Sequence, residues 1–99
     1  MRVRKTGADS AQRLEDLVNI GPKIAQTLGM VGITTPAEFF ARDPYDVFEQ
    51  LLTRVDPTLC RCALASIVGA HQGIVWHKIH KQAAQEFIAR TGYKWPNRC

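Results

Sequence analysis

LVNIGPKIA, residues 17–25, contains the junction between two predicted helices of a 99-residue chain. On both sides of it apolar residues recur at three- and four-residue intervals, which places them on one face of a helix. Asn19-Ile20-Gly21 breaks the pattern, and Pro22 stands where the first position of a new helix favours proline. We therefore predict a helix from about Ser10, its N-cap, to Val18, and a second from Pro22 to near Gly29, with a tight hairpin between them.

Three further helix starts are predicted where a capping residue precedes proline, at Thr35-Pro36, Asp43-Pro44 and Asp56-Pro57. Glu38 has the spacing to complete a capping box with Thr35. The helix expected from Pro57 to Gln72 is apolar on most sides, which is typical of a central helix. A last helix is expected from about His77 to Arg90, with Gly92 as its stop.

These features predict an all-α fold, a compact bundle of five or six short helices that contains one helix-hairpin-helix motif. We expect a flexible basic tail over residues 1–9, a single helical domain over residues 10–92 and a C-terminal tail over residues 93–99. The side chains expected in the core are Leu17, Ile20, Ala25, Leu28, Ile33, Phe48, Leu64, Ile67, Val68 and Trp76. For Trp76 a core position is favoured over a stacking platform for bases.

Composition and charge narrow the function classes. The chain is 45% hydrophobic and 22% charged, close to the average of globular proteins, and has no apolar run of the ~20 residues that a membrane span needs. Three cysteines, an odd number, favour a reducing compartment, so we expect a cytoplasmic protein. The net charge is +4, with basic ends and an acidic middle, residues 14–56. Basic ends suit a nucleic-acid partner, whereas the acidic middle does not.

The hairpin carries the candidate site. A helix N-terminus presents N–H groups and a positive dipole end to an anion, and Gly21 would let the backbone approach a phosphate closely. Lys23 adds positive charge, small Ala25 allows close helix packing, and Ile20 anchors the turn in the core. Asn19 replaces the first glycine of the usual hairpin; it tolerates positive φ but adds a side chain at the contact surface. The predicted nucleic-acid-binding residues are Asn19, Ile20, Gly21, Lys23, Ala25 and Gln26, with Arg13, Lys78 and Lys81 as auxiliary basic residues.

The hairpin and the residues after it resemble a known group of proteins. The glycines and apolar residues continue as Gly29-x-x-Gly32-Ile33-Thr34-Thr35-Pro36 and Ala65-x-x-x-Gly69-Ala70-x-x-Gly73-Ile74-x-Trp76-x-x-Ile79. This series resembles the C-terminal domain of the TfoX/Sxy competence regulators and the small pathogenicity-locus or mitomycin-resistance proteins. The resemblance implies a small helical domain of bacterial type that binds DNA, and it assigns no catalytic activity. The N-terminal domain of the TfoX proteins has no counterpart here, so their regulatory role does not transfer.

Other chemistry is less well supported by the sequence. Cys60 and Cys62, two residues apart, would diverge by about 200° on a helix, and they form no metal-ligand spacing with His71, His77 or His80. We therefore expect no metal, no cofactor and no enzymatic activity. Two functions remain open: sequence-independent binding of the DNA backbone, or binding of a protein partner through the acidic helices that begin after Thr35 and Asp43. A monomer or a weak homodimer is compatible with either function.

Overall fold

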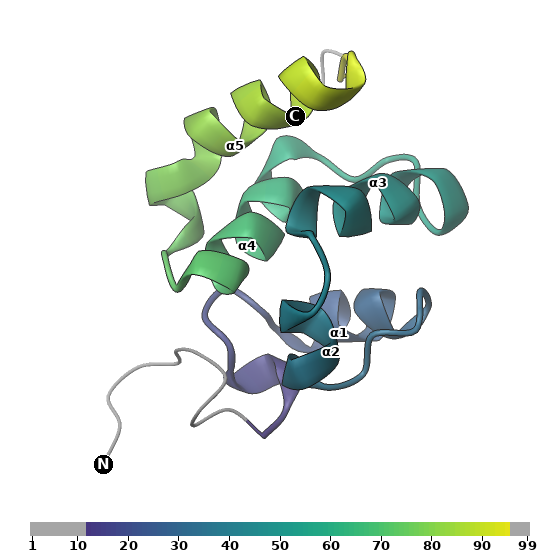
Figure 1. The fold of residues 1–99 in the computed structure, drawn as a ribbon, viewed down its shortest axis with the longest axis vertical. Helices are drawn as coiled ribbons and strands as arrows, with labels where there is room; N and C mark the ends of the chain where they lie inside the picture. The colour runs from purple at the N-terminus through teal and green to yellow at the C-terminus, as the bar shows by residue number, and fades with distance from the viewer. Residues whose placement is uncertain (1–11, 96–99) are drawn as a thin grey trace.

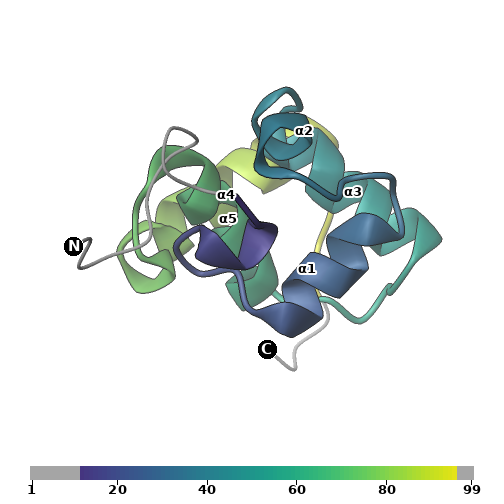
Figure 2. The same ribbon diagram turned by 90° about the horizontal axis from the view of Figure 1, so that it is seen from below.

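Helix α4 (Arg61–Gln72) lies at the centre of the structure, a computed structural model that describes residues 12–95. Every residue from Leu64 to Ala70 is buried, as the apolar sequence of this helix predicts. Helix α5 (Trp76–Thr91) packs along α4, and α3 (Pro44–Arg54) contacts it from another side. Helices α1 (Pro22–Gly29) and α2 (Pro36–Phe40) both lie on the side of α4 away from α5 in Figure 1, and Figure 2 shows them apart from each other. Residues 12–95 contain no strand, which confirms the all-α fold.

The predicted caps of α2 and α3 are present. The Thr35 hydroxyl accepts a hydrogen bond from the Glu38 N–H at 3.1 Å, and the Glu38 carboxylate accepts one from the Thr35 N–H at 3.2 Å. The carboxylate of Asp43 accepts bonds from the N–H groups of the first turn of α3. Pro36 and Pro44 occupy the first helical positions, where a missing N–H removes no intrahelical bond. At the other ends, Gly73 and Gly92 stop α4 and α5 in the left-handed conformation.

The helix predicted from Ser10 to Val18 is wrong in extent. Within the described residues only a 3-10 helix, η1 (Leu14–Asp16), forms there; Ser10 lies outside them, as does the tail predicted at residues 1–9. The Asp16 carboxylate accepts hydrogen bonds from the backbone N–H groups of Gln12 and Arg13, both at 2.9 Å. These bonds close a short turn at the start of η1, within the range of the expected helix. Leu17 is extended, which ends that turn.

The start predicted at Asp56-Pro57 is also wrong, because α4 begins only at Arg61. Asp56 instead accepts hydrogen bonds from the backbone N–H and the hydroxyl of Thr58, and so caps a local turn. The Leu59 carbonyl, which a helix starting at Pro57 would use internally, accepts the indole N–H of Trp95 at 3.1 Å. The C-terminal segment therefore competes for the backbone of the expected first turn.

The core agrees with the predicted list at all but two positions. Among the largest fully buried side chains are Leu17, Ile20, Leu28, Ile33, Phe48, Leu64, Ile67 and Val68. Ala25 is half-buried, and Trp76, predicted to be buried, is 39% exposed. The buried indole is Trp95, which packs against Phe48 and Phe87. None of the described helices combines the length and the apolar character that crossing a membrane would require.

Candidate functional site

The predicted hairpin lies between η1 and α1. Asn19 adopts the left-handed conformation, φ +70°, as expected of the residue that replaces glycine. The side chain of Ile20 is buried and anchors the turn in the core. Gly21 is the N-cap of α1 with an extended backbone, φ −99° and ψ −176°, and a Cβ built on it would meet nothing within 4 Å. The fold therefore leaves the space in front of Gly21 open.

The side chain of Asn19 connects this hairpin to the turn between α4 and α5. Its Nδ2 donates to the Ile74 carbonyl at 2.7 Å and to the Ser66 carbonyl at 3.4 Å. Its Oδ1 accepts the backbone N–H of Trp76 at 3.0 Å. The amide of Asn19 thus points toward the α4–α5 turn and not outward. Both ribbon views show the two turns side by side (Figures 1 and 2).

The two adjacent turns have the same local design. In each, a left-handed residue is followed by isoleucine, and the helix begins three residues after the left-handed one: Asn19 and Ile20 precede α1, and Gly73 and Ile74 precede α5. The N-caps Gly21 and Val75 are both extended and make no side-chain cap. The sequence-based prediction covers only the first turn; the signal for the second is Gly73-Ile74 at the same distance before a helix.

The starts of α1 and α5 are therefore close together, and they differ at the first residue: Pro22 has no N–H, and the Trp76 N–H is bonded to Asn19. The first N–H groups of a helix have no intrahelical acceptor, and neither first turn carries an acidic residue. By contrast, α2 and α3 begin with side-chain caps and acidic first turns. Helix α4 also lacks a side-chain cap, but its start lies at the far end of a twelve-residue helix, about 18 Å from the α4–α5 turn.

The predicted basic residues divide into two groups. Lys23, in the first turn of α1, and Lys78, in the first turn of α5, are both exposed, and Lys81 is exposed one turn further along. Arg13 instead forms an ion pair with Glu15 at 3.2 Å, so its charge is partly neutralised. A hydrogen bond from its own backbone N–H and the contact with Arg13 hold the pKa of Glu15 below its ordinary value, although partial desolvation opposes them.

Beside the hairpin, a shallow groove of about 390 Å³ brings together some of the predicted residues. Ala25 and Gln26 line it from α1, together with Arg13 and Glu15 from the preceding segment. Lys78 and Lys81 do not line this groove. The candidate residues are therefore divided: Ala25, Gln26 and Arg13 line this groove, whereas Lys23 lines a separate, mostly apolar pocket on another side of α1.

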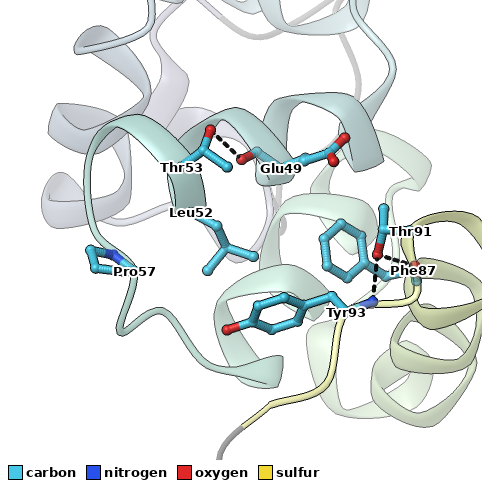
Figure 3. Close-up of a pocket in the computed structure, with 7 residues that line it drawn as sticks. All are labelled: Glu49, Leu52, Thr53, Pro57, Phe87, Thr91 and Tyr93. Carbon is cyan, nitrogen blue, oxygen red and sulfur yellow. Dashed lines mark hydrogen bonds between the residues drawn. The ribbon is translucent and has the colours of Figure 1, made fainter.

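A cavity of about 200 Å³ lies elsewhere, between α3 and the C-terminal end of α5 (Figure 3). Leu52, Phe87 and Tyr93 supply its apolar walls. Its two threonine hydroxyls bond the local backbone: Thr53 donates to the Glu49 carbonyl at 3.0 Å, and Thr91 donates to the Phe87 carbonyl at 2.8 Å. Both threonine hydroxyls are therefore already bonded to carbonyls of their own helices.

The histidines and cysteines form no metal-binding group in the part of the chain that the structure describes. Cys62 Sγ and His80 Nε2 lie 3.8 Å apart. His71 contacts the rings of Phe39 and Phe40, and its Nε2 is buried without a hydrogen-bond partner. Residues 12–95 thus hold no group of three or more metal-ligand side chains.

Comparison with known proteins agrees with this fold. No curated protein matches the sequence. The structure is similar to the crystal structure of an uncharacterised protein from Listeria monocytogenes, with a TM-score of 0.69 and 27% sequence identity over 85% of this chain and 99% of that one. The family described as pathogenicity locus, Cdd1, matches residues 7–87, which span most of the helices described above. On this match the chain belongs to the pathogenicity-locus (Cdd1) family.

Proposed function

We propose that this protein is a non-enzymatic module that binds the phosphate backbone of duplex DNA without reading its sequence. The observation that carries the proposal is the pairing of two helix starts through Asn19. Each start offers a positive dipole end and an exposed lysine, Lys23 on α1 and Lys78 on α5, while the Trp76 N–H at the start of α5 already donates to Asn19. The N-terminus of a helix is a favourable site for an anion such as phosphate.

Gly21 supports the same function. Its extended backbone is accessible to any residue, and no neighbouring atom excludes a side chain there. The fold alone therefore does not require glycine at this position. A glycine that packing and φ do not require is well suited to a surface that another backbone approaches closely.

The alternative function, a protein-binding module that uses the acidic helices, has less support. Several acidic groups of α2 and α3 already bind within the protein. Glu38 completes the cap of α2, and Asp43 caps α3 while it also contacts Arg90 at 3.1 Å. The acidic face is thus partly neutralised by internal contacts.

A DNA-binding titration tests the proposed function. Fluorescence anisotropy of labelled duplexes at ~50 and ~200 mM salt should show saturable binding that weakens with salt and is equal for unrelated sequences. Lys23→Gln, which keeps most of the aliphatic stem, should weaken binding to all duplexes alike and reduce the salt slope by about one charge. Lys94→Gln is the matched control, because Lys94 follows the opposite end of α5 and is exposed.

Chemical-shift changes complete the test. Under the proposed function they centre on residues 19–25 and 73–78 when duplex DNA is added. Absence of binding at low salt would reject the proposal. Shifts confined to α2 and α3 upon addition of a candidate protein would favour the alternative.

A further inference from the structure

Trp76, beside the paired turns, is a large aromatic side chain that is partly exposed to solvent. Four large hydrophobic side chains are exposed among residues 12–95, and two of them are consecutive: Val75, 37% exposed, and Trp76, 39% exposed. They are the N-cap and the first residue of α5. The core does not need this indole, because Trp95 fills the aromatic cluster around Phe87.

The position of Trp76 is well defined although its ring is partly exposed. Its backbone N–H donates to Asn19 Oδ1 at 3.0 Å. The ring meets those of His77 and His80 at centroid distances of 5.8 Å, edge to face in both cases. His80 is itself half-buried and lies 3.8 Å from Cys62. An aromatic ring held in this way loses little conformational entropy when it binds a flat partner.

The groups around Trp76 indicate which flat molecule its ring could bind. The indole comes from the helix start that the proposed function assigns to phosphate, with Lys78 two residues further on. An aromatic ring beside phosphate-binding groups is the arrangement by which proteins bind single-stranded nucleic acid. Bases inside a duplex are already stacked on both faces, so only an unpaired base or a duplex end offers a free face.

We propose that Trp76 stacks on an unpaired nucleobase, so that the module prefers DNA in which a duplex meets a single strand. This inference rests on the proposed function, because the same paired turns hold the duplex backbone. The single strand then continues past the start of α5 and places a base on the indole. Stacking of one base on an aromatic side chain strengthens binding by about five- to a hundred-fold.

Two DNA probes of equal duplex length test the inference. One is blunt, and the other carries a single-stranded extension; both are measured by anisotropy with the intact chain. The extended duplex should bind at least about five-fold more tightly than the blunt one. Trp76→Leu should abolish this preference, so that the ratio of the two affinities falls to about one whatever the variant does to blunt-duplex affinity. Ile88→Ala, which shortens another exposed apolar side chain further along α5, should retain the preference.

Tryptophan fluorescence gives a second measurement that needs no loss-of-function variant. In a Trp95→Phe chain, Trp76 is the only tryptophan, and the extended duplex should quench it more than the blunt duplex does. Equal affinity and equal quenching for the two probes would overturn the inference and leave the proposed function standing. Equal weakening of both probes by Trp76→Leu would also overturn it. No binding to either probe would overturn both proposals.

Discussion

The side chain of Asn19 occupies space that Gly69 leaves open: a Cβ built on Gly69 would lie 2.6 Å from Nδ2 of Asn19 and closer still to the carbonyl oxygen of Ile74. Gly69 belongs to the central helix α4, where glycine is otherwise unfavourable. Because Gly69 has no side chain, Asn19 can reach the α4–α5 turn and connect it to the turn before α1. Gly69 thus permits a close approach between the two turns inside the molecule, distinct from the approach predicted at Gly21.

Gly69→Ala should destabilise the protein. Alanine alone favours a helix by about 1 kcal/mol over glycine, but the backbone carbonyl of Ile74 cannot move aside cheaply. We expect a net loss of about 1–3 kcal/mol, measured by urea unfolding. Gly29→Ala is the matched control, because it lies in α1 with nothing near its Cβ, and it should be neutral or slightly stabilising. Equal stability of the two variants would contradict this packing argument.

The three hydrogen bonds of Asn19 predict different effects for two substitutions. Asn19→Gly retains the left-handed backbone but removes all three bonds, and we expect a loss of about 1–3 kcal/mol. Asn19→Asp should cost more at neutral pH, because its carboxylate would face the carbonyl oxygens of Ile74 and Ser66. Thermal unfolding measured side by side ranks the two. An aspartate variant as stable as the wild type would show that Asn19 does not connect the two turns.

Much of the fold follows from local sequence signals. Helices α2 and α3 begin where a capping residue precedes proline, and α4 and α5 end at left-handed glycines. These signals depend on backbone chemistry within one turn, so they can be read without knowing the rest of the structure. The central position of α4 follows in the same way from its nearly continuous apolar sequence.

The predictions that are wrong, such as the helix start at Asp56-Pro57 and the burial of Trp76, depend on contacts between residues distant in the sequence. Asp56-Pro57 has the pattern of a helix start, but Trp95, far along the chain, bonds the Leu59 carbonyl. Residue type alone cannot show which of the two tryptophans, Trp76 or Trp95, is buried. The packing of the C-terminal segment against the helices decides it. The sequence does not show that the second turn lies beside the first, because that contact depends on hydrogen bonds between Asn19 and residues 55 and 57 positions away.

Trp95 should be essential for stability although it lies in the segment predicted to be a tail. It packs against Phe48, Phe87 and Tyr93 and donates to the Leu59 carbonyl. Trp95→Ala should cost about 3–5 kcal/mol in chemical unfolding. Trp95→Phe keeps an aromatic ring but loses the hydrogen bond, so it should cost clearly less. If alanine and phenylalanine behave alike and close to wild type, the segment does not belong to the core.

Asp43 should make stability depend on acid pH. Burial raises the pKa of Asp43, but hydrogen bonds from Arg90 and from the N–H groups of Tyr45 and Asp46 outweigh it and hold the pKa below its ordinary value. The carboxylate therefore stabilises the protein above the ordinary pKa of about 3.9, and this contribution disappears as the pH falls through the lowered value.

Asp43→Asn isolates this contribution, because asparagine is an equally good N-cap without the charge. The difference in unfolding free energy between wild type and variant should be largest near neutral pH and vanish in acid. It should stay below about 1 kcal/mol, since the Arg90 and Asp43 side chains are 41% and 40% exposed. A difference that is constant from neutral pH to acid would contradict the assignment.

Gly21→Ser should separate stability from DNA binding. Serine is a strong N-cap, its Cβ meets no neighbour, and the extended backbone of Gly21 suits it. Its hydroxyl would accept the same first-turn N–H groups that the proposed function assigns to a phosphate. Stability should therefore hold or rise slightly, while affinity for duplex DNA falls several-fold. Thermal unfolding and anisotropy on one preparation measure both. Unchanged affinity in a stable variant would remove the start of α1 from the binding surface.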